Sequence, residues 1–188
     1  PLLPPLTFQI ERGEKIALVG MNGVGKSTLL KTMLGKVQPL DGKFYLGEYL
    51  EPSYFEQEVK ADKITPIDDV WNAFPSMEQA QVRAALARAG LKTDHITRPL
   101  NSLSGGEQAK VRLCKLMMDQ TNWLIFDEPT NHLDVDAKEE LKRAMKEFKG
   151  TIVLVSHEPE FYEGLVTKIW NVQDWFTTRE TKELNEFK

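Results

Sequence analysis

The residues whose types and spacing most clearly indicate a chemical function form a glycine-rich segment near the start of the chain. Gly20 is followed by four residues and then by Gly25, Lys26 and Ser27. Glycines let a backbone wrap closely enough to aim its N–H groups at phosphate oxygens, and the positive end of a following helix strengthens the attraction. The lysine would reach the β- and γ-phosphates, while the serine hydroxyl would ligate Mg²⁺. The segment predicts a phosphate-binding loop made by Gly20, Met21, Asn22, Gly23, Val24, Gly25, Lys26, Ser27 and Thr28.

Two adjacent carboxylates lie much further along the chain, directly after a hydrophobic run. Residues 123–126 read as a buried strand, and Asp127 and Glu128 follow it. Adjacent carboxylates after a strand are commonly just a solvated turn. A parallel strand beside the phosphate-binding loop would instead deliver Asp127 to the Mg²⁺ shell and Glu128 to the position of an attacking water. Paired with the loop, these residues predict a hydrolytic site with Glu128 as its general base.

A third segment places two glycines at a predicted helix start, in the order Ser104, Gly105, Gly106 and Glu107. The serine and the glutamate have the spacing of a capping box, which is the plain structural interpretation. Capping alone does not explain consecutive glycines in a first helical turn, where each costs about 1 kcal/mol relative to alanine. Bare backbone N–H groups at this position would admit a phosphate.

The elements that must position these segments alternate between strand and helix patterns. Strands are predicted at residues 6–10, 15–19, 123–126, 151–155 and 166–171, with short strands within 43–55. One helix should run from the phosphate-binding loop to Gly35, and another should start with a capping box at Ser76 and Gln79 and end at Gly90. Further helices are predicted at residues 105–118 and 135–149. Helices between buried strands imply an α/β fold with a mostly parallel sheet.

Composition limits the class of protein. The chain has 188 residues, 24 basic and 28 acidic side chains, a formal charge of −4 and 41% hydrophobic residues. These values are typical of one soluble globular domain, with room for two lobes. The hydrophobic runs are far too short to cross a bilayer, and a single cysteine indicates a reducing compartment. Because an initiator methionine and a signal sequence are both missing, we expect a piece of a longer cytoplasmic protein.

Together, the three motifs resemble those of the ATP-binding cassette (ABC) ATPases. Residues 103–108 match the signature that separates this family from other phosphate-loop ATPases, and the resemblance runs from residue 6 to about residue 170. It implies a P-loop fold with a mostly parallel sheet, flanking helices, N-terminal antiparallel strands and a short helical lobe. The implied cofactors are ATP and Mg²⁺. The implied boundaries are a core lobe at about 1–57 and 120–176, a helical signature lobe at about 58–119 and a polar tail at 177–188.

The resemblance also assigns roles to smaller motifs. Gln57 stands where the family places a glutamine that joins the two lobes and contacts Mg²⁺ or its water, although a lone glutamine after a strand is normally a surface residue. His157 resembles the switch histidine that contacts the γ-phosphate, and residues 131–134 resemble the D-loop, which crosses to a partner cassette. The aromatic residue that usually stacks on adenine would precede residue 6, and Phe8 is more typical of a core position.

The family mechanism pairs two cassettes head to tail around ATP. The resemblance implies that Ser104, Gly105 and Gly106 of one cassette cover the phosphate-binding loop of the other. ATP then holds the two faces together until hydrolysis and phosphate release separate them. The expected partner is therefore a second cassette, either in the same parent chain or in a homodimer. A single cassette is expected to hydrolyse ATP slowly, because its own signature residues cannot reach its own nucleotide.

Finer features resemble one branch of the family, the ABC-F proteins. Leu103 follows Gln57 by 46 positions (103 − 57), which makes a short helical lobe by family standards. Residues 131–134 and 156–158 and the pair Phe161-Tyr162 also resemble ABC-F proteins, and the two ends of the chain resemble their second cassette. ABC-F proteins are soluble tandem cassettes that act on the ribosome as translation factors or in antibiotic resistance. The ribosome is therefore an expected partner of the parent protein, and membrane insertion is not expected.

Two alternatives from other classes stay open. One is the ATPase subunit of an ABC membrane transporter, and the other is a non-hydrolysing nucleotide-binding module. The presence of both Glu128 and His157 argues against the second. Three basic residues on the helix after the signature are expected to form a solvated face, with contact to RNA as the alternative: Lys110, Arg112 and Lys115.

Overall fold

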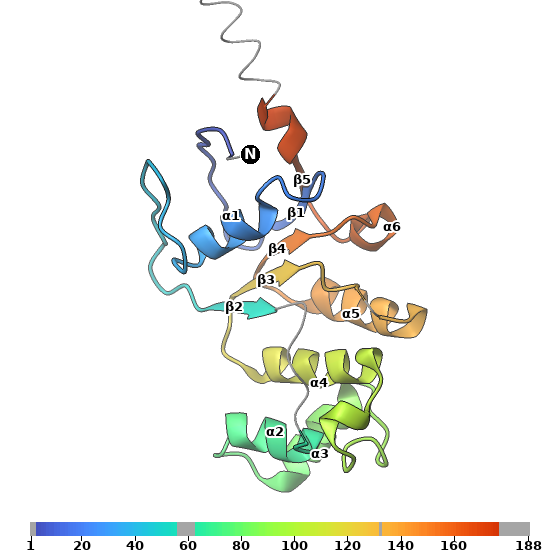
Figure 1. The fold of residues 1–188 in the computed structure, drawn as a ribbon. Coiled ribbons are helices and arrows are strands. Elements are labelled where there is room, and N and C mark those ends of the chain that lie inside the picture. Colours follow the sequence, from blue (N-terminus) through green and yellow to red (C-terminus); the bar gives the residue numbers. More distant parts are fainter. Residues whose placement is uncertain (1–2, 56–62, 132, 177–188) are drawn as a thin grey trace, which may run out of the picture. The chain divides into compact units, whose positions relative to one another are not determined.

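The computed structural model describes residues 3–55, 63–131 and 133–176 (Figure 1). The chain divides into two compact units, each with its own hydrophobic core. The sheet unit comprises the described residues up to Tyr54, Asn122–Pro129 and the described residues from Lys149 onward. The helical unit comprises the described parts of Phe55–Thr121 and Thr130–Phe148. Residues 130–148, which the sequence places in the core lobe, cluster with the helical unit.

A five-stranded sheet forms the centre of the sheet unit (Figure 1). Its strands are β1 (Lys15–Val19), β2 (Pro52–Phe55), β3 (Trp123–Asp127), β4 (Thr151–Val155) and β5 (Lys168–Asn171). The order across the sheet is β2-β3-β4-β1-β5, and β3, β4, β1 and β5 pair in parallel. In register, Ile16 and Ile125 both lie opposite Val153. β4 is buried along its whole length, as expected of a central strand covered on both faces. The mostly parallel sheet confirms the predicted fold class.

The labelled helices of the sheet unit, α1 (Lys26–Met33) and α6 (Pro159–Tyr162), follow the carboxyl ends of its strands, and a further helical segment at residues 172–176 follows β5. α1 follows β1 and buries Leu30 in the same core as Leu18 and Ile125. The helix ends as predicted before Gly35, whose φ of 70° favours glycine. α6 is a short turn of helix after β4 that buries Phe161.

The helical unit contains four α-helices and one 3-10 turn among its described residues. They are α2 (Pro66–Ala73), α3 (Gln79–Arg88), η1 (Leu100–Ser102), α4 (Gly105–Met118) and α5 (Val135–Glu147). α2, α3 and α4 share a core that includes Val70, Val82, Leu86, Val111 and Cys114, all almost inaccessible to solvent. Burial raises the pKa of the Cys114 thiol to about 11, so this thiol is a packing group rather than a nucleophile. Among the described residues, no helix combines the length and hydrophobicity that crossing a membrane requires.

The start of α3 differs from the prediction. The capping box is formed by Glu78 and Gln81, and it does not involve Ser76 and Gln79. A turn closes just before the helix, with the Met77 N–H donating to the Phe74 carbonyl at 3.1 Å. Proline at position 75 suits the second position of such a turn, so the helix begins only after it.

Two predicted strand regions also differ. Residues 6–10 and 43–51 carry no strand, so the predicted N-terminal antiparallel pair is absent from the described residues. Strand-forming side chains alone do not make a strand, because an extended segment is stable only when a neighbour completes its hydrogen-bond ladder. β2 is the one strand found in the region where several short strands were expected, within the part of the chain that the structure describes.

Candidate active site

The phosphate-binding loop connects β1 to α1 through backbone conformations that glycine favours. Gly20 has a φ of 144° and Gly25, the N-cap of α1, has a φ of 104°. A Cβ atom on Gly20 would also lie 3.2 Å from the Cβ of Val172, closer than side chains normally approach. No side chain caps the first turn of α1, and Ser27 and Thr28 are exposed there. The N-terminus of this helix is therefore shaped by glycines and open to an anion.

Lys26 lies folded underneath this loop. Its side chain is buried, with 5% of the residue exposed, and its Nζ donates to the carbonyls of Gly20 and Met21 at 2.7 and 2.8 Å. Burial lowers the pKa of the ammonium group, and the negative charges of Glu128 and Asp127 act in the opposite direction. The ammonium group is thus held at the loop by weak neutral acceptors, and phosphate oxygens would be stronger ones.

The two predicted carboxylates lie at the end of β3. Asp127 is the last residue of the strand, and its Oδ2 accepts a hydrogen bond of 3.2 Å from the hydroxyl of Tyr54. Glu128 has a φ of 49°, a left-handed conformation that is uncommon outside glycine, while its N–H donates to the Val155 carbonyl at 3.0 Å. The strained backbone turns the glutamate out of the strand immediately after the aspartate.

His157 meets Glu128 at the same edge of the sheet. The Nε2 atom of His157 lies 3.1 Å from Oε1 of Glu128, and 37% and 26% of the two side chains are exposed. β1, β4 and β3 are adjacent and parallel, so the loop, the histidine and the carboxylates all follow carboxyl ends of neighbouring strands. Ligands of open α/β sheets bind at this kind of edge. The structure therefore brings together Lys26, Asp127, Glu128 and His157.

The signature residues begin α4 in the helical unit. The Ser104 side chain accepts a hydrogen bond from the Glu107 N–H at 3.3 Å, and the Glu107 carboxylate accepts one from the Ser104 N–H at 2.8 Å. The other carboxylate oxygen of Glu107 lies 3.0 Å from Nδ1 of His95. Ser104 and Gly105 are exposed. The predicted capping box is confirmed here.

Gly106 is the buried member of the signature. A Cβ atom at this position would lie 3.1 Å from the Cβ of Ala137 and 3.3 Å from Oδ2 of Asp134. Asp134 is the N-cap of α5 and accepts from the Ala137 N–H at 2.8 Å. The second signature glycine therefore lets the start of α4 lie against the start of α5.

The basic residues of α4 have partners within the helical unit. Lys110 lies 3.2 Å from Glu140, Lys115 lies 2.7 Å from Asp69, and the Arg112 guanidinium stands over the Phe55 ring at 4.9 Å. They are not the freely solvated face that the sequence suggested. Gln57 and His132 lie outside the described residues. Among the described residues, no group of three or more histidine, cysteine, aspartate or glutamate side chains could hold a metal ion.

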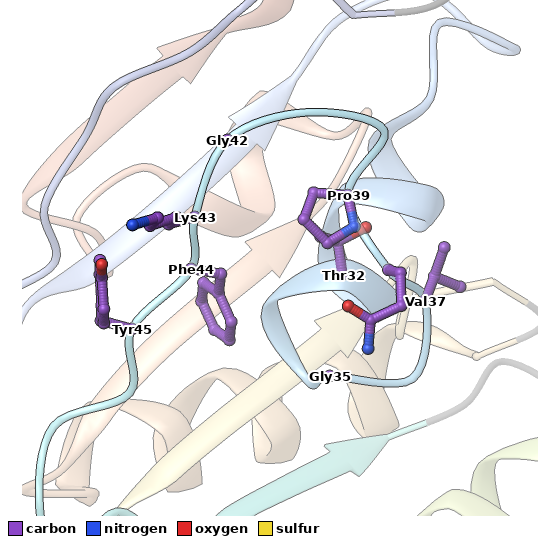
Figure 2. Close-up of a pocket in the computed structure, with 9 residues that line it drawn as sticks. Thr32, Gly35, Val37, Pro39, Gly42, Lys43, Phe44 and Tyr45 are labelled. Atoms are coloured by element: carbon purple, nitrogen blue, oxygen red, sulfur yellow. The ribbon is translucent and has the colours of Figure 1, made fainter.

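Two features of the sheet unit were not found by sequence reasoning. One is the Tyr54 hydroxyl on Asp127, whose only sequence signal is a tyrosine three residues before Gln57. The other is a hollow of about 360 Å³ between the carboxyl end of α1 and the following loop, lined by residues such as Thr32, Phe44 and Tyr45 (Figure 2). It lies at the opposite end of α1 from Lys26, so it is not the phosphate site.

Comparison with known proteins shows the family of this chain. The sequence model of the family described as "ABC transporter" matches residues 3–131, well over half of the chain. The chain belongs to this family and is an ABC ATPase cassette.

Two curated relatives are similar to most of the chain. The chain is 58% identical over 178 residues to a Bacillus subtilis (strain 168) protein described as an uncharacterized ABC transporter ATP-binding protein, YfmM, covering 94% of the chain and 34% of the relative. It is 43% identical over 169 residues to ABC transporter F family member 2 of Arabidopsis thaliana, covering 88% of the chain and 25% of the relative. The chain thus spans about a third or less of the length of these relatives.

A solved structure shows a similar fold. It is described as the complex of the archaeal ribosomal stalk protein aP1 and the archaeal ribosome recycling factor aABCE1. The TM-score is 0.72 at 27% identity, over 86% of this chain and 32% of that chain.

Proposed function

We propose that this cassette binds MgATP at the carboxyl edge of its sheet and hydrolyses it as one half of a two-cassette assembly. The observation that carries this proposal is the buried ammonium group of Lys26 at an uncapped helix N-terminus, together with the glutamate–histidine pair that follows the carboxyl ends of β3 and β4. A nucleotide with Mg²⁺ fits these residues. The loop offers backbone donors and a cation for phosphates, and an exposed serine hydroxyl and a carboxylate offer the oxygen ligands that Mg²⁺ prefers.

The binding roles follow from donor and acceptor chemistry. The Lys26 ammonium would leave the carbonyls of Gly20 and Met21 for the more strongly accepting β- and γ-phosphate oxygens. Ser27 and Asp127 would hold Mg²⁺, with Gln57 as a further contact. The backbone N–H groups of residues 20–28 would surround the phosphates, and Thr28 is exposed on the same first turn. Bound MgATP would supply the γ-phosphoryl group, with the metal offsetting its negative charge.

The catalytic role falls to Glu128. Its carboxylate would accept a proton from the attacking water, and the contact with His157 holds it at the sheet edge. The imidazole would also stand near the γ-phosphate, as the family resemblance implies for a switch histidine. Positioning and electrostatic stabilisation supply most of the rate enhancement in phosphoryl transfer, so a base held in one place is what the chemistry needs.

We propose that the signature residues act on a second cassette. Ser104 and Gly105 are exposed at the start of α4, where a helix N-terminus attracts an anion. In the head-to-tail arrangement implied by the family, they cover the phosphate-binding loop of the partner, and residues 131–134 cross the same interface. Turnover by this chain alone would then pass through a weak homodimer and be slow.

A dilution series tests this arrangement. Specific ATPase activity of the 188-residue chain should rise with protein concentration, and Ser104→Arg should depress it without weakening ATP binding to the monomer. Ala84→Arg, on the exposed side of α3, is the matched control for an added charge. Activity per molecule that stays constant on dilution, in a chain that light scattering shows to be monomeric, would contradict the two-cassette mechanism.

The parent protein is, we propose, a cytoplasmic ABC-F protein that acts on the ribosome. Support comes from the relative named as an F family member and from the similar structure of a ribosome recycling factor. The alternative is the ATPase subunit of an ABC membrane transporter, which the family description favours. The parent sequence distinguishes them, because an ABC-F protein carries a second cassette joined by a charged helical linker.

A further inference from the structure

We infer that Tyr54 is a positioning residue for the Asp127 carboxylate, a role that rests on the proposed function of Asp127 in holding Mg²⁺. Tyr54 lies on β2, next to β3 in the sheet, and its hydroxyl donates to Oδ2 of Asp127 at 3.2 Å. Both residues are partly buried. The hydrogen bond joins residues 73 positions apart in the chain.

The hydrogen bond restricts rotation of a group that otherwise has two equivalent orientations. A carboxylate at the end of a strand can turn about its last side-chain bond, and each turn exchanges its two oxygens. A donor on Oδ2 fixes that oxygen and leaves Oδ1 with its lone pairs available. The carboxylate therefore meets a metal ion or a metal-bound water in one orientation, without first losing rotational freedom.

A phenol suits this task better than a cation. A lysine or arginine on Oδ2 would offset the negative charge that draws Mg²⁺ to the site. A neutral hydroxyl orients the carboxylate without offsetting its negative charge. Hydrogen bonds from neutral groups to ligating carboxylates are a common feature around metal ions, and their loss typically costs 10- to 100-fold in metal affinity or activity.

The tyrosine ring is itself held from a second side. The Nζ atom of Lys36 lies 4.7 Å from the centre of the ring, and Lys36 follows the carboxyl end of α1. A cation over the ring face is attracted by the ring quadrupole, and this attraction favours the observed position of the ring. Tyr54 thereby contacts both the segment that follows α1 and the strand that ends with Asp127.

The decisive variant is Tyr54→Phe, which keeps the ring and its contact with Lys36 and removes only the hydroxyl. The matched control is Tyr45→Phe in the same unit, whose ring lines the hollow beyond α1 and is 80% exposed (Figure 2). For each protein, the rise in melting temperature at saturating ATP is followed as Mg²⁺ is added. Binding of Mn²⁺ to the ATP-loaded chain is measured separately by electron paramagnetic resonance.

We expect the Mg²⁺ midpoint and the Mn²⁺ dissociation constant to rise about tenfold in Tyr54→Phe and to stay unchanged in Tyr45→Phe. ATP affinity in EDTA should be the same in all three proteins. Equal metal midpoints in Tyr54→Phe and the wild type would overturn the role of Tyr54. A wild type whose ATP-induced stabilisation does not depend on Mg²⁺ would instead overturn the proposed site itself.

Discussion

The two glycine-containing helix starts of this molecule are built in opposite ways. At α1, the N-cap is Gly25, no side chain closes the first turn, and the Lys26 side chain bends back onto loop carbonyls. At α4, the N-cap is Ser104, and a complete capping box with Glu107 closes the turn. On the proposed function, the first start leaves its donors for phosphate oxygens, and the Lys26 side chain rearranges to receive them. The second is already ordered by its own side chains and is suited to present a fixed surface.

The difference extends to the surrounding groups. The start of α1 shares a sheet edge with a carboxylate pair and a histidine, so removing single groups there should change chemistry. The start of α4 has packing and capping partners, so changes there should alter stability and geometry first. Substitutions at the two helix starts test this difference.

The largest effect is expected for Glu128→Gln. The amide keeps the shape of the side chain but cannot accept the proton from water, so turnover should fall about 100-fold or more. ATP binding should be retained, and the ATP-bound state should hold two cassettes together, as seen by size-exclusion chromatography with light scattering. Glu163→Gln, at an exposed position after α6, serves as the control. Undiminished turnover in the parent protein would assign the base to another group.

A somewhat smaller effect is expected for Lys26→Ala. Losing charge-assisted hydrogen bonds to two phosphates should weaken ATP binding by about 100-fold or more, since each such bond contributes at least roughly 1.5 kcal/mol and two contribute about 3 kcal/mol. Isothermal titration calorimetry measures the change directly, and most of the rise in melting temperature caused by ATP should be lost. Lys31→Ala, exposed on the same helix, should bind as the wild type does. Equal stabilisation of wild type and Lys26→Ala by ATP would refute the phosphate-loop assignment.

Gly106→Ala should affect stability rather than ATP affinity. The new Cβ would lie 3.1 Å from that of Ala137, and overpacking of about 1–3 kcal/mol should outweigh the helix-propensity gain of about 1 kcal/mol. Urea unfolding should show a net loss, and adding Ala137→Gly should recover part of it by making room. If Gly106→Ala proves more stable than the wild type, the starts of α4 and α5 can move apart to admit the new Cβ atom at less cost than the geometry indicates.

The smallest effect concerns pH. The pKa of Glu107 is lowered below 4.5, chiefly because its carboxylate accepts a hydrogen bond from the Ser104 N–H. The Ser104 hydroxyl and the charges of His95 and Arg98 lower the pKa further, while burial acts in the opposite direction. A carboxyl group whose pKa is lower in the folded state stabilises the fold above its unfolded pKa and loses that contribution as pH falls. Glu107→Gln should therefore cost about 0.5 kcal/mol at pH 7, and the difference should shrink as the pH falls below 4.5. A difference that is the same at pH 7 and pH 3.5 would exclude a role for the charge.

Local signals explain what the sequence predicts well. Residues close in sequence determine several features that were predicted correctly. These are the bounds of α4, the end of α1 before Gly35 and the strands that lead to Asp127 and His157. The residues 6–10 and 43–51 have strand-like composition but no partner strand among the described residues, and composition cannot supply one. The contacts of Tyr54 with Asp127 and of His157 with Glu128 depend on the order β2-β3-β4, which joins distant segments.

The left-handed backbone of Glu128 has a consequence for how such cassettes diverge. A side chain in that conformation costs about 1–2 kcal/mol that glycine would not. If Glu128 is the proton acceptor, as proposed, selection for that role works against the backbone preference at the same residue. Where a descendant cassette no longer needs to cleave its nucleotide, mutation pressure toward a more stable fold should replace this glutamate with glycine or asparagine. Glycine or asparagine at this position in a related cassette would then predict ATP binding without turnover.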